Sequence, residues 1–489
     1  MTSLHIGFVS QGWAPDVGGI ESHTSDLVRE LLELGHRVSA ICLDYTGKAE
    51  PFGTTRTTVG GVEVTRMSYG YHDHDSLAKV VRNRSAEQVF AAWLDEVEPD
   101  VLHVHHLTGF GLGVLTTAKS RGVKQLMTLH DYWPICPRGQ MFRVDNVNCE
   151  GIDPTACGTC LAKSFPHVMP SGRGKHYGPY DSVDENGNPS GEPEQLEADD
   201  AVVASRRTEF ALHCLHHADL LATPSARTRD IYIAAGLHPD ELTVVENGID
   251  VQGLRFEVDS LKSCLRPRSE VRLGILGTVL PSKGVLELAQ VFAELKAEGR
   301  ATNLVLEIHG HMPSYHGDST YVESLLVLDE QTPDLHVMGP FGHGALGTLL
   351  SRLDGVAAPS RWEEVFGLTV REARAAGLPV LVSDAGGLPS VADGGAGLVV
   401  SRDDRQAWKD AIALFAEDDA QRAAWANSSA PVWSAGQMAV EYVELYRSML
   451  SKDEVAQEVL APMEPAAEVE VPEEIKLQSK VDKSGQAGS

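Results

Sequence analysis

Two successive series of alternating strand and helix patterns most constrain how this chain can fold. Each series begins with a buried strand, at residues 5–10 and 271–277, and each of these strands leads through a glycine-containing loop into a helix, at residues 20–34 and 285–296. Strand, glycine loop, helix and strand in this order are typical of a Rossmann-type unit. A chain of 489 residues is long enough for two such units. We therefore expect an α/β protein with parallel sheets and two facing Rossmann-like domains.

The segment 359–387 carries the most specific functional pattern. A helix is expected to begin near Gly367, so its first backbone amides would form an anion site. Those amides belong to Gly367, Leu368 and Thr369. Glu364 precedes the helix and Glu372 lies about two turns further on. Amides suit phosphates and carboxylates suit vicinal hydroxyls, so the pattern fits a nucleotide sugar. Taken alone it fits an amphipathic surface helix with solvated glutamates equally well, and the following strand 379–383 and Gly386-Gly387 favour the functional interpretation.

This segment resembles the E-x7-E segment of the group-1 (family 4) glycosyltransferases, which are retaining enzymes of GT-B fold. The resemblance implies that Glu364 contacts the donor sugar and that Glu372 holds the ribose diol. The adjacent Glu363 is a competing candidate, but the spacing to Gly367 favours Glu364. The loop glycines Gly18 and Gly19 resemble the family's first loop, where backbone approaches the donor diphosphate; alone, they would indicate a plain tight turn.

Lys283 closes the loop TVLPSKG after the first strand of the second series. A lysine here could stabilise the leaving diphosphate without a metal ion, whereas without the resemblance it would be a solvated loop lysine. The resembling family has an arginine five positions earlier, where this chain has Thr278. The resemblance implies metal-independent transfer with retention of anomeric configuration and no cofactor for catalysis.

Histidines follow two predicted strands of the first series. His105 and His106 follow the strand 101–104, and His130 follows the strand 125–129. In open α/β sheets, ligands bind at the carboxyl ends of the strands. His130 resembles the family histidine that reaches the donor sugar or the acceptor side, and we assign it to catalysis. Structural roles are favoured for His105 and His106.

Four cysteines fall within 25 residues of one glycine- and proline-rich segment, at Cys136, Cys149, Cys157 and Cys160. The preceding His-Asp-Tyr-Trp and Cys-Pro resemble one branch of the same glycosyltransferase family. The C-x2-C pair and four sulfur ligands favour a structural zinc ion, because such a segment buries little core. The alternatives are an iron–sulfur cluster, two disulfides or buried free thiols.

The pattern predicts the following division of the chain. The first domain covers residues 1–249, with a cysteine-rich loop at 131–165 and a disordered insert at 170–200; the second, nucleotide-sugar-binding domain covers residues 250–430; a helix at 431–450 crosses back to the first domain; and an acidic disordered tail covers residues 451–489.

The composition limits which partners the chain is expected to bind. The net charge of −28 disfavours nucleic acid. No signal peptide or transmembrane run is visible, and the odd count of seven cysteines favours a reducing cytoplasm; peripheral contact with a membrane is compatible with this prediction.

We expect transfer from a nucleotide-sugar donor to a glycan, lipid-linked or other acceptor, as in cell-surface polysaccharide synthesis. The alternatives are an epimerase or phosphorylase on the same architecture and a catalytically weak binding subunit, the last suggested by Thr278.

Overall fold

The computed structural model describes residues 2–16, 18–47, 49–70, 76–172, 199–266, 268–315, 317–428 and 432–460. By its contacts the chain divides into Met1–Tyr446, which contains both sheets, and Arg447–Ser489, of which the continuation of the last helix as far as Leu460 is described. Most of the predicted insert and the tail from residue 461 lie outside the described residues.

The first sheet has the strand order β3-β4-β2-β1-β5-β6-β7-β8. All neighbouring strands pair in parallel except β3, which forms an antiparallel hairpin with β4. The strands are β1 (His5–Val9), β2 (Arg37–Asp44), β3 (Thr54–Val59), β4 (Val62–Ser68), β5 (Val101–Val104), β6 (Lys124–Thr128), β7 (Leu220–Thr223) and β8 (Leu242–Val244). Strand β3 is mostly exposed and polar and shows no apolar alternation, so its local sequence carries no clear strand pattern.

Seven helices connect the described strands of this sheet. They are α1 (Gly19–Glu33), α2 (Leu77–Val81), α3 (Arg84–Val97), α4 (Gly113–Ser120), α5 (Pro154–Ser164), α6 (Asp200–Leu215) and α7 (Ala226–Ala234). Polar side chains cap several of them: Asn83, Asp153 and Ser225 each accept a hydrogen bond from a first-turn amide. These caps explain why the helices begin where they do.

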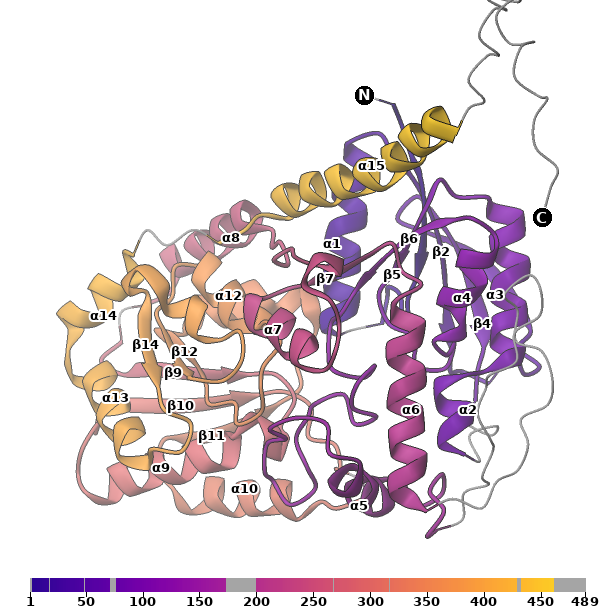
Figure 1. Cartoon of the computed structure of the whole chain (residues 1–489). Coiled ribbons are helices and arrows are strands. Elements are labelled where there is room, and N and C mark those ends of the chain that lie inside the picture. Colours follow the sequence, from indigo (N-terminus) through magenta and orange to yellow (C-terminus); the bar gives the residue numbers. More distant parts are fainter. Residues whose placement is uncertain are drawn as a thin grey trace, which may run out of the picture. The chain divides into compact units, whose positions relative to one another are not determined.

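The second sheet is entirely parallel, in the order β11-β10-β9-β12-β13-β14. Its strands are β9 (Val271–Leu276), β10 (Leu304–His309), β11 (Leu335–Gly339), β12 (Gly355–Ala358), β13 (Val380–Ser383) and β14 (Gly397–Val400). Its helices are α8 (Val251–Ser263), α9 (Val285–Ala297), α10 (Thr320–Gln331), α11 (Leu346–Arg352), α12 (Leu368–Ala375), α13 (Arg405–Glu417) and α14 (Asp419–Ala426). The two sheets form separate groups of strands in Figure 1. Two parallel-sheet α/β domains are therefore present, as predicted.

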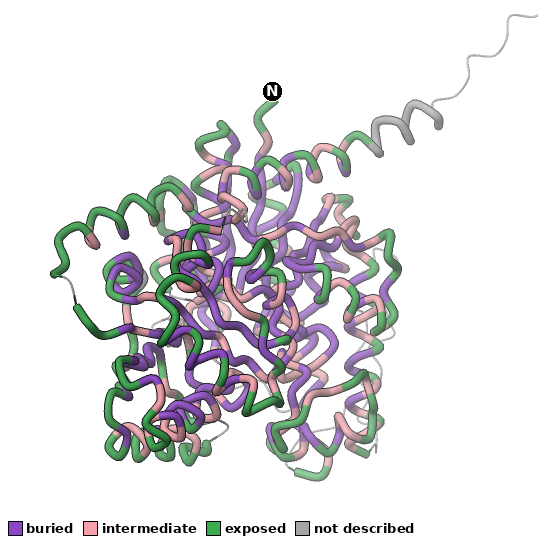
Figure 2. The backbone as a smooth tube through the Cα atoms, turned by 90° about the vertical axis from the view of Figure 1, so that its left-hand side faces the viewer, coloured by how far each residue is buried: buried purple, intermediate pink, exposed green. Residues whose placement is uncertain are grey.

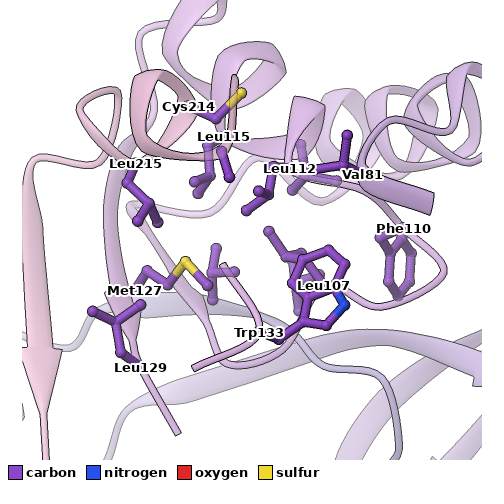
Figure 3. Close-up of a cluster of buried hydrophobic side chains, with 14 of the residues drawn as sticks. Val81, Leu107, Phe110, Leu112, Leu115, Met127, Leu129, Trp133, Cys214 and Leu215 are labelled. Carbon is purple, nitrogen blue, oxygen red and sulfur yellow. The ribbon is translucent and has the colours of Figure 1, made fainter. Parts of the chain in front are cut away.

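Each domain has its own buried core. Figure 2 shows buried positions concentrated in the interior of the backbone tube, with exposed positions along its outer coils and turns. In the first domain, side chains from β6, α4 and α6 meet around Leu115, Met127 and Leu215, all at most 2% exposed. Figure 3 shows this cluster extending to Trp133, in the segment that follows β6. The core thus reaches the chain immediately before the first clustered cysteine.

The last helix, α15 (Ala435–Leu460), joins the first sheet through two buried tyrosines. The Tyr446 hydroxyl lies 2.6 Å from Nδ1 of His103, and the Tyr442 hydroxyl lies 2.9 Å from Oγ1 of Thr128. The helix continues past the predicted end at residue 450, because 451–460 hold mainly helix-forming residues and the next proline is Pro462. No helix in the described part of the chain is both long and apolar enough to cross a membrane.

Candidate active site

A cavity of about 350 Å³ lies at the carboxyl ends of the second sheet. The strand order reverses direction between β9 and β12, and in open α/β sheets a ligand crevice forms at such a switch point. The loops after these two strands and the start of α12 line the cavity, together with the start of α1 from the first domain. The structure brings these predicted site residues into the cavity lining: Gly18, Gly19, Thr278, Lys283, Glu364, Gly367, Leu368, Thr369 and Glu372.

Lys283 and Glu364 form an ion pair in this cavity. The Lys283 ammonium donates to both carboxylate oxygens of Glu364, at 2.9 and 2.6 Å, and lies 5.1 Å from the centre of the Trp362 ring. Glu364 also accepts hydrogen bonds from the Ser360 hydroxyl and the Trp362 indole N–H. The carboxylate is therefore held in one orientation by three side chains. Lys283 reaches it from a short turn that ends at Gly284, whose φ of +67° favours glycine.

The competing Glu363 points to a different environment. Its carboxylate accepts from Arg227 at 3.0 Å and from Arg402 at 3.1 Å, and it does not line the cavity. The pair with Arg227 connects α7 of the first domain to the loop of Glu363, whereas the pair with Arg402 lies within the second domain. The geometry therefore favours Glu364 over Glu363 as the carboxylate that faces a ligand.

The chain turns sharply into α12 at Gly367, which has φ of +79°. Arg371 braces this corner: its guanidinium donates to the Phe366 carbonyl at 2.6 Å and lies 3.8 Å from the Phe366 ring centre. The amides at the start of the helix consequently lie at the cavity wall, where the partial positive charge of a helix N-terminus favours an anion.

Glu372 lies on α12, inside the same cavity. Its side chain is buried, and its carboxylate has no hydrogen-bond partner among the described residues. Burial, with a smaller effect of Asp26, raises the pKa of Glu372 to about 7. A buried carboxylate without a partner is costly, so a ligand that donates hydroxyl groups to it would relieve that cost.

His130 lies in a separate group of histidines rather than in the cavity lining. Its Nε2 is 3.0 Å from Nδ1 of His105, and ring nitrogens of His23, His105 and His130 all lie within 4.8 Å of one another. Neither ring nitrogen of His23 meets hydrogen-bond geometry, although the Asn247 side chain lies nearby. Burial lowers the pKa of His23 to about 3 and holds that of His130 well below its usual range. These imidazoles are therefore neutral, and they could hold a metal ion.

His106 has a structural partner, since its Nε2 lies 3.2 Å from the Asp131 carboxylate. The Asp131 carboxylate also accepts the Trp133 amide, and the Asp131 carbonyl accepts the Tyr232 hydroxyl. This network fixes the chain that leaves β6.

The four clustered cysteines line a second cavity, of about 570 Å³, in the first domain. All seven cysteines of the chain are free thiols, so the structure contains neither of the two disulfides considered as an alternative. The expectation that this segment lacks regular structure is wrong for its second half. Cys157 and Cys160 lie on α5, which forms because Asp153 caps it and Pro154 occupies its first position.

Sequence reasoning missed several residues around the site. Trp362 and Ser360, which orient Glu364, flank it in sequence and could have been noticed as donors. His311 and Phe341 line the cavity from loops after β10 and β11, where only the three-dimensional sheet order places them. His23 lies on α1 and joins the histidine group through space, without a signal in its local sequence.

Two sequence families match this chain. Residues 262–430 match the family described as "Glycosyl transferases group 1", and residues 17–148 match "Glycosyltransferase Family 4". A D-inositol 3-phosphate glycosyltransferase of Corynebacterium urealyticum is 31% identical over 245 residues, which are 47% of this chain and 56% of that protein. The lipopolysaccharide core biosynthesis mannosyltransferase LpsB of Rhizobium meliloti is 28% identical over 253 residues, 48% of this chain and 66% of that protein. The chain thus spans between about half and two thirds of the length of these two curated relatives.

Solved structures match along nearly the whole chain. Sucrose-phosphate synthase from Thermosynechococcus elongatus has a TM-score of 0.63 at 16% identity and covers 92% of this chain and 100% of its own. The Anabaena HepE protein in complex with UDP and glucose has a TM-score of 0.60 at 15% identity and covers 91% of this chain and 100% of its own. These matches confirm the predicted GT-B fold.

Proposed function

From the premise that this chain carries group 1 and family 4 glycosyltransferase domains on a GT-B fold, we propose that it transfers a sugar from a nucleoside-diphosphate sugar to a hydroxyl acceptor. The observation that carries the proposal is the cavity at the second sheet, which combines a lysine, two carboxylates and a helix N-terminus. These are the groups that a diphosphate, a sugar and a ribose require.

The donor is assigned to this cavity group by group. The diphosphate binds at the amides of Gly367 and the start of α12, with Lys283 supplying the positive charge. The ribose diol donates to Glu372, which is buried and has no hydrogen-bond partner among the residues that the structure describes. Glu364 accepts hydroxyl groups of the sugar, in the orientation that Ser360 and Trp362 impose.

Transfer is proposed to proceed without a metal ion and with retention of configuration. Charge develops on the leaving diphosphate as the bond to the sugar breaks, and a preorganised ammonium and helix amides stabilise that charge. Gly18 and Gly19, at the cavity wall, let the backbone of the first domain approach the phosphates closely. His130 acts at the acceptor side as a neutral imidazole, consistent with its lowered pKa.

The acceptor is proposed to be a polyhydroxylated molecule such as a sugar phosphate, a glycan or a lipid-linked saccharide. Curated relatives act, by their names, on D-inositol 3-phosphate or in lipopolysaccharide core biosynthesis. We place the reaction in the cytoplasm, where nucleotide sugars serve cell-surface polysaccharide synthesis, and we assign it no nucleic acid partner.

A panel of UDP-, GDP- and ADP-sugars tests this function. One donor class should raise the melting temperature in proportion to the logarithm of its concentration, because only a ligand of the native state stabilises by mass action. The same donor should be consumed when acceptors are supplied. Brief EDTA treatment should leave turnover unchanged, and loss of turnover in a folded sample would contradict metal-free transfer.

A catalytically weak binding subunit is the second candidate, and one residue favours it. Thr278 lines the cavity where the resembling family has an arginine, so the cation available to the diphosphate from this loop is Lys283. Donor binding without measurable hydrolysis or transfer, across acceptors of all three classes, would favour this second function.

A further inference from the structure

The four clustered cysteines belong to one short module of the first domain, residues 132–164. Cys136 lies in the turn after Trp133, Cys149 follows a small hairpin marked by the antiparallel bridge between Phe142 and Asn148, and the other two lie on α5. All four side chains line the same cavity of about 570 Å³. Closeness in sequence alone does not require that all four cysteines line one cavity.

The turn around Cys136 brings the chain back past this residue. The Gly139 amide donates to the Cys136 carbonyl at 2.7 Å, and Gly139 and Met141 have φ of +74° and +47°. The Met141 carbonyl then accepts the Cys149 amide at 2.8 Å. The local backbone therefore links the first two cysteines of the module.

Cys157 and Cys160 supply the chelating pair. They are three residues apart on α5, so their side chains project from the same face of the helix. Such a C-x2-C pair is a common chelating arrangement, and two further cysteines complete the four sulfur ligands of a tetrahedral structural site.

A buried arginine beside the thiols points independently to negative charge. Arg207 is 2% exposed, donates to the carbonyls of Trp133 and Pro134, and has no carboxylate ion-pair partner among the described residues. Its Nε has no hydrogen-bond partner within the described residues. Cys136, Tyr232, Asp131 and Cys157 all lie within electrostatic range of this guanidinium. Thiolates at the two cysteines would add negative charge beside a buried cation, which is favourable.

We propose that one Zn²⁺ binds this module as a structural ion, coordinated by the four thiolates of Cys136, Cys149, Cys157 and Cys160. Four thiolates and Zn²⁺ carry a net charge of −2, which faces Arg207 in the interior. Zinc–sulfur bonds of about 2.3 Å place neighbouring sulfurs about 3.8 Å apart. Among the described residues, only His23, His105 and His130 bring three metal-ligand atoms within 4.8 Å of one another. No three of the four thiols lie that close, so zinc binding draws the thiols together.

The module is also a contact between the two domains. The Asn148 side chain donates to the Arg361 carbonyl at 2.7 Å, and the Arg361 guanidinium donates to the Asn146 carbonyl at 3.2 Å. The Arg138 guanidinium donates to the hydroxyl of Tyr315, which follows β10. Arg361 precedes Trp362 and Glu364, so the zinc ion would stabilise a surface that supports the cavity.

Metal content of the full-length protein, purified without chelators, tests the proposal. The wild-type chain should contain one zinc ion, and Cys157→Ser should lose it. The matched control is Cys264→Ser, because Cys264 is exposed and lies outside the module; this variant should keep the zinc. If Cys157→Ser fails to fold, exchange of wild-type zinc for Co²⁺ gives the second measurement, and intense sulfur-to-cobalt charge-transfer bands are expected.

Four results would overturn the zinc site. The first is metal-free wild-type protein whose module thiols react freely with Ellman's reagent. The second is iron with the visible absorption of an iron–sulfur cluster. The third is a mass under non-reducing conditions that reveals disulfides in the module. The last is Cys157→Ser protein that retains zinc at the wild-type stoichiometry. None of these measurements depends on glycosyl transfer, so they are independent of the proposed function.

Discussion

Lys283 and Glu364 hold each other through an ion pair, which limits how each can contact a ligand. The lysine side chain is 30% exposed and the glutamate side chain 11% exposed, so the ammonium is the more accessible partner. On the proposed assignment, a diphosphate would compete with Glu364 for the ammonium, and sugar hydroxyls would then compensate the carboxylate. The ion pair would thus keep both charges in position for the donor.

Lys283→Ala and Glu364→Gln should each reduce turnover by roughly two orders of magnitude or more, the scale of losing one preorganised charge contact. The matched control is Glu363→Gln, because Glu363 is the adjacent carboxylate but pairs with Arg227 and Arg402 outside the cavity. Steady-state rates with the donor found in the panel give the comparison. Equal losses in Glu363→Gln and Glu364→Gln would contradict the assignment.

Glu372 should make donor affinity depend on pH. Burial raises its pKa from the ordinary 4.5 to about 7, and a ribose diol favours the ionised form by donating to it. Below pH 7 the carboxyl must lose a proton for the donor to bind, so affinity should fall by about tenfold per pH unit. Titration calorimetry in buffers of different ionisation enthalpy would detect the released proton. Glu372→Gln should bind more weakly and without this slope.

Glu372 should also make the free energy of unfolding depend on pH. Between pH 4.5 and 7 the folded chain keeps a proton on Glu372 that the unfolded chain has lost, so the free energy of unfolding decreases as pH rises through this window. The decrease is at most about 3 kcal/mol. Glu372→Gln should therefore be more stable than the wild type at pH 8, by chemical denaturation without donor. A variant less stable than wild type at that pH would contradict the burial argument.

At the scale of elements, the loop after β13 supports Glu364 through close backbone contact. Gly386 has φ of +60°, and a Cβ there would overlap the Glu364 carbonyl oxygen; the Gly387 amide donates to that same oxygen. Gly395 also has positive φ, +81°, but has open space around it. A side chain would be strained by positive φ at either glycine, but only at Gly386 would it also collide with the backbone of Glu364.

Gly386→Ala should lower donor affinity by at least tenfold, because the added methyl group displaces the backbone of Glu364. Gly395→Ala should cost about 1 kcal/mol of stability, the typical penalty for a side chain at positive φ, and leave affinity unchanged. Donor titrations of both variants, with melting curves as the folding check, give the readout. Similar affinities in the two variants would show that the β13 loop does not position Glu364.

Elements that carry a periodic pattern could be predicted from the sequence. The buried strands β1 and β9 and the amphipathic helix α9 were predicted within a residue or so of their bounds, because apolar patterns are local information. The helix α5 was not, since its proline, its glycine and the glycines and prolines before it are typical of a loop, while its stability comes from an N-cap and from packing on α6. The helix α8 was missed too: among its thirteen residues only Val258 is buried.

Helix α15 should depend unequally on its two buried tyrosines. Tyr446→Phe removes the hydrogen-bond partner of His103 Nδ1, whereas after Tyr442→Phe the Thr128 hydroxyl still contacts His103. Leaving a buried polar group unsatisfied costs about 1–3 kcal/mol, so Tyr446→Phe should be the more destabilising change by denaturant unfolding. If Tyr442→Phe were the more destabilising change, the hydrogen bond between Tyr446 and His103 would not be what stabilises the docking of α15.

At the scale of the whole molecule, the sequence predicted the half of the site that is contiguous. Glu364, Gly367 and Glu372 lie within one segment, and its spacing alone predicted a shared ligand. The contribution of the first domain required the fold. For example, the Ser225 hydroxyl donates to the Val365 carbonyl at 2.7 Å, across 140 positions of sequence. Such contacts depend on how the chain returns through space, which local patterns do not encode.

The junction of Tyr442 and Tyr446 with the first sheet has a consequence for synthesis on the ribosome. His103 and Thr128 belong to strands made early, yet their hydroxyl partners emerge only after the entire second sheet has been translated. Until then, the side chains of His103 and Thr128 lack their tyrosine partners. The first domain can therefore complete its fold only after the second domain has been synthesised.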